Sequence, residues 1–101
     1  MSSTTSIDVR SAVEAARFYL QQMIDDLTDS GNPIQGLRLE ETELSEDRKY
    51  WLITLGFDRP LGDHLYPLQS VAVNKKYERE YRIFKIDAET KELKSMKIRE
   101  L

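Results

Sequence analysis

Apolar residues in the first third of the chain recur with the spacing of one face of an α-helix. Over residues 9–27 they follow one another at steps of three and four, and mostly charged or amide side chains lie opposite them. Asp8 can cap the backbone amides that follow it, and helices commonly end at residues such as Gly31 and Pro33. The pattern predicts an amphipathic helix whose apolar stripe is Val9, Val13, Ala16, Leu20, Met23, Ile24 and Leu27.

Two segments in the middle of the chain show the alternation of β-strands. Residues 37–44 begin by alternating Leu with Arg and Glu, and residues 50–57 form an aromatic and β-branched run. The polar stretch between them predicts a turn, so the two strands pair antiparallel. The second strand directs one set of side chains toward the core, namely Trp51, Ile53, Leu55 and Phe57.

The remainder of the chain predicts a long connection and a final hairpin. Residues 58–70 contain Pro and Gly among apolar side chains, and a short Val-Ala-Val stretch at 71–73 opens a further strand. Alternation resumes over residues 77–86 and, after a polar turn, over residues 93–98. Because Leu93 and Met96 differ in parity, a bulge is expected between them.

These elements predict an α+β fold, in which one N-terminal helix packs on a four-stranded antiparallel meander. A length of 101 residues with 40% hydrophobic residues suits one domain over residues 1–101. The start of the chain is rich in Ser and Thr, so residues 1–7 are expected to be a disordered lead-in.

The pattern resembles the PepSY-type and wider cystatin-like class, in which one helix packs across a curled antiparallel sheet. The resemblance rests on Ala12 and Ala16 of the helix, the strand opening at 36–41, the aromatic strand at 50–53 and the strand and turn at 84–93. The chain departs from the class at Lys91, where a glycine is usual, and in the length of segment 58–76. The resemblance implies a binding or regulatory module without catalytic residues.

Composition excludes several classes of site. The chain has no cysteine, so it forms neither a disulfide nor a cysteine-ligated metal site. The first 47 residues have only Arg10, Arg17 and Arg38 as bases, whereas bases outnumber acids from Arg48 onward, and the net charge is −3. This asymmetry predicts a bipolar surface, which can recognise a charged partner or a second copy. Without a signal-like start or an apolar run of about 20 residues, a cytoplasmic protein without membrane contact is expected.

Two groups of residues are candidates for a catalytic site or a metal site. The single histidine, His64, follows Asp63 and could act as a general base in a small cone-shaped α+β enzyme, although neighbours in sequence are poorly placed to pair. A cluster of carboxylates offers oxygen ligands for a hard cation, namely Glu40, Glu41 and Glu43, with Glu46 and Asp47 close by. On an alternating strand, however, Glu40 and Glu41 point to opposite faces. We therefore predict no catalytic residue, no metal and no cofactor.

Basic and aromatic residues are mixed over residues 75–82, near the start of the predicted strand at 77–86. Lys75, Lys76, Arg79 and Arg82 accompany tyrosines at 77 and 81, as in single-stranded nucleic-acid platforms. Acidic residues at 78 and 80 interrupt them and would repel phosphates. Weak nucleic-acid binding is therefore only an alternative, and it requires these four bases to share a face without acidic neighbours.

Apolar and aromatic residues on the sheet face opposite Trp51 are the best indication of function. One helix cannot cover both faces, so these side chains meet either the 58–70 connection, a partner protein or a second copy in a homodimer. The leading hypothesis is a non-catalytic protein-interaction or regulatory module. Its predicted partner-binding residues are Tyr50, Leu52, Leu65, Tyr66, Tyr77, Tyr81 and Ile83.

Overall fold

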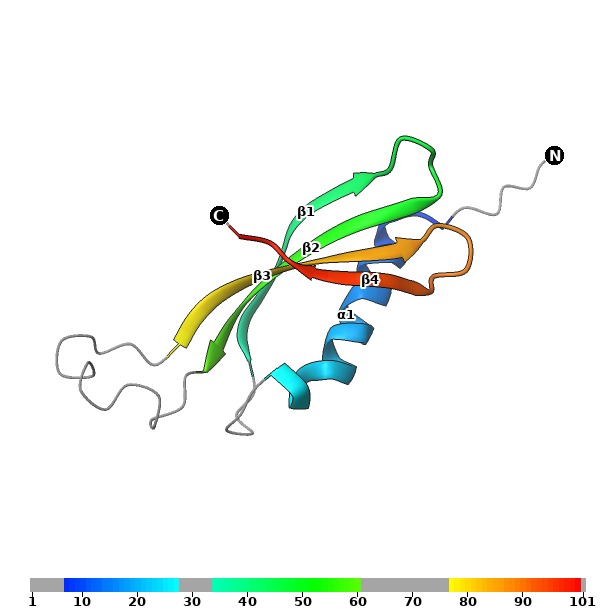
Figure 1. The fold of residues 1–101 in the computed structure, drawn as a ribbon. Coiled ribbons are helices and arrows are strands. Elements are labelled where there is room, and N and C mark those ends of the chain that lie inside the picture. Colours follow the sequence, from blue (N-terminus) through cyan, green and yellow to red (C-terminus); the bar gives the residue numbers. More distant parts are fainter. Residues whose placement is uncertain (1–6, 28–33, 61–76, 101) are drawn as a thin grey trace, which may run out of the picture.

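The computed structural model describes residues 7–27, 34–60 and 77–100 (Figure 1). In these residues one helix precedes four strands, which form an antiparallel sheet in the order β1-β2-β3-β4. The fold is therefore α+β with an N-terminal helix and a four-stranded meander, as predicted. The elements are α1 (Val9–Leu27), β1 (Gln35–Leu44), β2 (Tyr50–Pro60), β3 (Tyr77–Asp87) and β4 (Leu93–Ile98).

Helix α1 begins where the sequence indicates. The backbone amide of Ser11 donates a hydrogen bond of 2.8 Å to Asp8 Oδ1, which caps the helix and lowers the pKa of Asp8. Val9 was expected in the buried stripe but is 38% exposed, so that prediction is wrong. Ala12 is the buried residue of the first turn, and its small side chain lets this part of the helix approach the sheet. Fully buried helix residues are Ala12, Ala16 and Leu20.

The core lies between α1 and one face of the sheet. Helix α1 packs on β2, β3 and β4, and Figure 1 shows it on one side of the strands. The predicted core face of β2 is confirmed, because its residues 53, 55 and 57 are completely buried, and Trp51 packs against them. Strand β3 adds Phe84 and Ile86, which are equally buried. The sheet face turned away from α1 is called the outer face below.

Ile7 corrects the prediction of a disordered lead-in over residues 1–7. Its backbone amide donates to the carbonyl of Ala88 (2.6 Å), and its own carbonyl accepts from the indole N–H of Trp51 (3.1 Å). These two bonds hold Ile7 against the core, where its partly buried side chain packs on the buried cluster. Residues 1–6, the predicted helix stop at Gly31 and Pro33 and the predicted strand start at 71–73 lie outside the described residues.

The strands differ from the predicted ones in length and in regularity. Strand β2 continues past residue 57 to Pro60, because Asp58 and Arg59 still pair with β3. The bulge predicted between Leu93 and Met96 is confirmed by a register shift at this point of the β3–β4 pair. Strand β1 has two register shifts of its own against β2, one between Gln35 and Arg38 and one between Leu39 and Glu41. These bulges interrupt both edge strands, which discourages open-ended strand pairing with other chains.

Two turns carry a non-glycine residue in the left-handed conformation. Arg48 has φ 62° in the β1–β2 turn, and Lys91 has φ 69° in the β3–β4 turn. In the second turn Asp87 Oδ1 accepts the backbone amides of Glu89 (2.8 Å) and Thr90 (2.9 Å), which lowers the pKa of Asp87. Lys91 thus keeps the conformation for which glycine is usually needed.

Replacing Lys91 by glycine is expected to raise the free energy of unfolding by about 0.5–1 kcal/mol, because glycine adopts positive φ without a steric cost. Urea unfolding followed by circular dichroism measures the change. The matched control is Lys91→Ala, which also removes the charge but keeps the Cβ atom, and it should leave stability near that of the wild type. Equal stabilisation by both variants would show that the lysine side chain, not its backbone conformation, carries the cost.

A candidate binding groove on the outer face of the sheet

The register of β2 and β3 brings together the predicted partner-binding residues that the structure describes. Side chains of Tyr50 and Leu52 on β2 lie on the outer face, since Trp51 and residues 53, 55 and 57 face the core. On β3 the same face carries Tyr77, Tyr81 and Ile83. The two predicted loop residues, Leu65 and Tyr66, lie outside the described part of the chain.

These residues do not form a bare apolar patch, because charged side chains lie over two of their aromatic rings. The ammonium of Lys85 lies 4.3 Å from the centre of the Tyr50 ring, and the Arg79 guanidinium carbon lies 5.7 Å from that of Tyr81. All five outer-face residues are half-buried. The most exposed large apolar side chains of the described residues lie elsewhere, on Val9, Phe18, Leu39 and Ile98.

Two arginines reach across the outer face to β1. Arg79 of β3 donates to the carbonyl of Gly36 (2.7 Å) and to the carboxylate of Glu40 (2.8 Å). Arg99, just after β4, forms an ion pair with Glu41 at 2.6 Å, so its side chain spans the sheet. Thr54 lies between these strands and is only 3% exposed, although it is on the outer face. Long paired side chains therefore shield the middle of this face.

A bulge in β1 makes this arrangement possible. The register passes from Leu39 opposite Leu55 directly to Glu41 opposite Thr54, which leaves Glu40 without a Cα partner on β2. Glu40 then reaches Arg79 over the outer face, so the expectation that Glu40 and Glu41 point to opposite faces is wrong. Each carboxylate pairs with an arginine, and no cluster in the described residues has three or more ligands suited to a metal ion.

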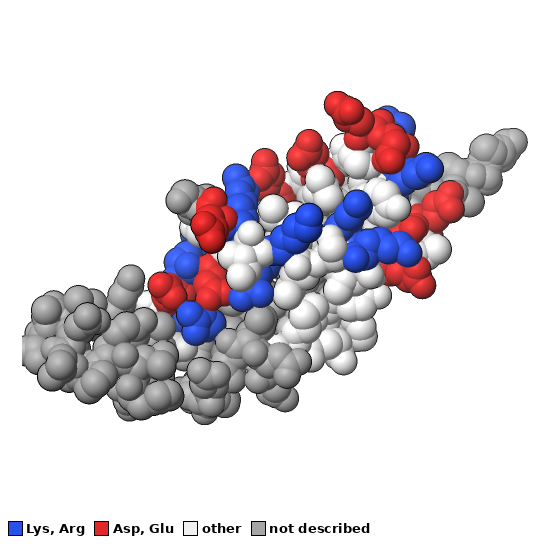
Figure 2. Space-filling view, in the orientation of Figure 1, with Lys and Arg blue, Asp and Glu red and all other residues white. Residues whose placement is uncertain are grey.

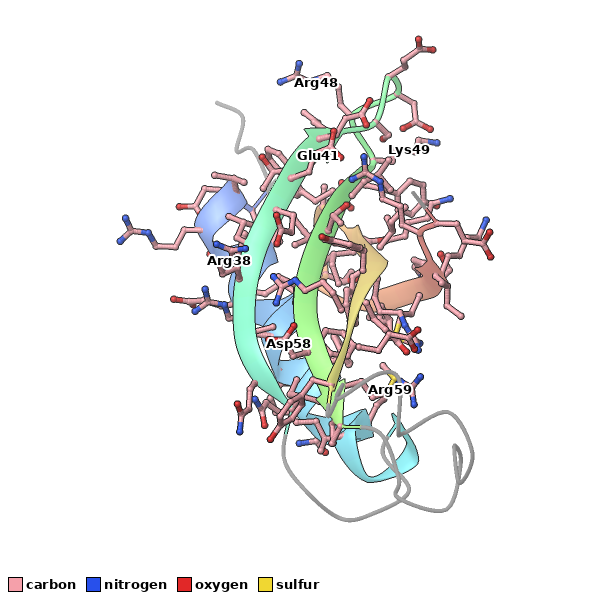
Figure 3. All side chains as sticks on the ribbon, turned by 90° about the vertical axis from the view of Figure 1, so that its left-hand side faces the viewer. Arg38, Glu41, Arg48, Lys49, Asp58 and Arg59 are labelled. Carbon is pink, nitrogen blue, oxygen red and sulfur yellow. The ribbon has the colours of Figure 1, made fainter. Side chains whose placement is uncertain are left out.

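At the end of the outer face nearest the β1–β2 turn, the surface is hollowed into an open groove of about 690 Å³. Its floor is apolar, and Leu52 and Ile83 lie diagonally across the two central strands. Figure 3 shows Glu41 near this end of β1, next to the turn that carries Arg48 and Lys49. The lining residues are Glu43, Ser45, Glu46, Asp47, Tyr50, Leu52, Ile83, Lys85, Ser95 and Lys97. We call this hollow the outer groove.

The outer groove is acidic on one side and basic on the other. Glu43 and Glu46 belong to β1 and its turn, whereas Lys85 and Lys97 belong to β3 and β4. Over the wider face, Figure 2 shows Lys and Arg across the middle and Asp and Glu along the upper edge and at both ends. Within the described residues, none of these four side chains forms an ion pair.

Asp47, the third acid of the groove, has a structural role. Its Oδ1 accepts hydrogen bonds from the Ser45 hydroxyl (2.6 Å) and from the backbone amide of Lys49 (3.0 Å). The Ser45 bond is the main reason why the pKa of Asp47 lies below its ordinary value, and the Lys49 amide adds to it. Asp47 is therefore held as a carboxylate that shapes the wall of the groove.

The partner-binding residues predicted from the sequence do not include Glu43, Lys85 or Lys97. Alternation does place Lys85 on the face of Tyr81 and Ile83, so its position could be predicted. Lys97 follows a bulge, and Glu43 is opposite Leu52 only in the register that the structure shows. No local pattern in the sequence indicates that these charges flank one groove.

The basic residues proposed for nucleic-acid binding do not share a face. Arg79 lies on the outer face, whereas Arg82 faces the core side opposite Leu55 and pairs with Glu80 at 2.8 Å. Both arginines are thus neutralised by carboxylates, which removes the condition that this alternative requires. Lys75 and Lys76 lie outside the described residues.

Asp63 and His64, the residues of the alternative catalytic hypothesis, also lie outside the described residues. No helix in the described residues is long and apolar enough to cross a membrane. No protein-family model, curated protein or solved structure matches the chain. The PepSY-like and cystatin-like resemblance therefore stays a prediction.

Proposed function

We propose that this chain is a small non-catalytic interaction or regulatory module, which binds a protein or a second copy of itself through its outer face. The observation that carries the proposal is the outer groove, where an apolar floor lies between Glu43 and Glu46 on one side and Lys85 and Lys97 on the other, none of which forms an ion pair with another described residue. Protein interfaces combine these features, with an apolar and aromatic centre inside a polar rim. A cytoplasmic location without a cofactor belongs to the same proposal, and the cysteine-free sequence supports it.

The composition of the groove favours a protein surface over a small ligand. Its charges have both signs, and they lie on different strands, so a partner must present complementary charges over a comparable width. The Tyr50 ring under the Lys85 ammonium adds an aromatic anchor of the kind enriched at interface centres. The groove is open rather than enclosed, which suits a surface that meets another surface.

A photo-crosslinking amino acid at position 52 tests the proposal. The variant carries this amino acid in place of Leu52, whose side chain lies in the floor of the groove. When it is irradiated in the source cell, we expect covalent adducts with a bound protein. The matched control carries the group at Glu14, an exposed position of α1 remote from the outer face. Adducts are identified by mass spectrometry, and an adduct yield at position 52 no higher than at position 14 would contradict the proposal.

A further inference from the structure

Charge is distributed across the strands of the outer face, not along them. One row of register partners runs Glu41, Thr54, Ile83 and Lys97, from β1 to β4. The next row runs Glu43, Leu52, Lys85 and Ser95. In both rows the β1 end is acidic, and the bases lie on β3 or β4. A surface of this kind is complementary to itself after a rotation that exchanges β1 with β4.

We infer that a second copy of this chain binds the outer groove, outer face to outer face, about a two-fold axis that runs parallel to the strands between β2 and β3. The inference rests on the proposed function and names its partner. Such an axis exchanges β1 with β4 and β2 with β3 while it preserves the position along the strands. Glu41 and Glu43 of one copy therefore face the region of Lys97 in the other copy.

Charge complementarity selects this axis from the alternatives. A two-fold axis in the same plane but perpendicular to the strands would place β1 against β1, and Glu43 would then meet a second Glu43. Like charges in direct opposition disfavour a complex, whereas the parallel axis joins acids to bases on both sides. The groove charges that lack an ion pair within the described part of the chain would gain partners in this way.

The same axis also covers the apolar floor. Leu52 and Ile83 lie on the two central strands that flank the axis, in adjacent register rows. After the rotation, Leu52 of one copy lies opposite Lys85 of the other and diagonally beside Ile83, and the same contact recurs on the other side of the axis. Burial of these side chains supplies a non-directional attraction, and the flanking charges set the orientation.

Sedimentation velocity over a concentration series tests the inference with the purified protein. The wild type is expected to shift from monomer to dimer with rising concentration, and less readily at high salt. Glu43→Lys or Lys97→Glu should each weaken the dimer about tenfold, because the symmetry makes each substitution act twice and turns attraction into repulsion. The double variant, which exchanges the two charges, should recover most of the affinity.

The control Arg17→Glu changes an exposed charge of α1 and should leave the dimer unaffected. A wild type that stays monomeric at all concentrations would overturn the inference, and so would a double variant as weak as the single ones. The dimer and the proposed function are tested by different measurements, so one can be contradicted without the other. A monomer that still forms adducts with another protein from position 52 would overturn only the dimer, whereas a monomer without such adducts would overturn both.

Discussion

Replacing Phe84 by alanine is expected to lower the free energy of unfolding by about 3–5 kcal/mol, as is usual for a buried Phe in a close-packed core. Phe84 is completely buried between β3 and α1, with Ile53 and Met96 as its register partners on β2 and β4. The cavity left by the ring cannot be filled without moving the helix. Small domains have about 5–15 kcal/mol of stability in total, so this variant should lie close to the unfolding threshold.

The matched control for this prediction is the preceding residue. Ile83→Ala also truncates an apolar side chain on β3, but Ile83 points to the outer face and is only half-buried. Its cost should be less than half that of Phe84→Ala. Urea unfolding followed by circular dichroism gives both values. At a protein concentration that keeps the chain monomeric, similar losses would mean that the two sheet faces of one copy are equally buried, contrary to the structure.

Replacing Glu80 by glutamine is expected to cost about 2–3 kcal/mol at neutral pH, because it leaves two guanidinium groups without their shared anion. Glu80 accepts hydrogen bonds from Arg59 and from Arg82, and the side chains of Glu80 and Arg82 are only 16% and 11% exposed. Arg82 Nε is already buried without a hydrogen-bond partner in the described residues. Loss of the carboxylate would therefore leave further buried hydrogen-bond donors of Arg82 without an acceptor.

The same variant should change the pH dependence of stability. Burial tends to raise the pKa of Glu80, but the hydrogen bonds from Arg82 and Arg59 prevail and hold it below its ordinary value. A carboxyl whose pKa is lowered by folding contributes stability at pH values above its unfolded pKa, near 4.3, and loses it as the pH falls through the folded pKa. Unfolding measured between pH 6 and pH 3 should thus show a shallower decline for Glu80→Gln.

The decline should become shallower but should not vanish, because folding also lowers the pKa values of Asp8, Asp47 and Asp87. Glu78→Gln is the matched control on the same strand. Glu78 pairs with Arg59 among the described residues, and its side chain is 47% exposed, so its replacement should cost less than about 1 kcal/mol. A pH profile of Glu80→Gln that matches the wild type would exclude the role assigned to this cluster.

Most of the fold could be predicted from the sequence, because its signals are local. The three- and four-residue periodicity determines α1, Asp8 determines where it begins, and alternation assigns the residues of β2 and β3 to their two faces. Even the bulge of β4 is visible as the change of parity between Leu93 and Met96. Local patterns failed at Val9 and Ile7, where contacts with distant residues decide which side chains are buried and which segment is held.

The candidate site depends on the tertiary structure, because its parts come from all four strands. The sequence by itself determined that Tyr50 and Leu52 share one face of β2 and that Tyr81 and Ile83 share one face of β3, since side chains alternate with a period of two. Only the folded register decided that Glu43 and Lys97 lie on opposite sides of one groove and that the bulge turns Glu40 toward Arg79. Such pairings depend on the lateral alignment of strands distant in sequence, which local periodicity does not encode.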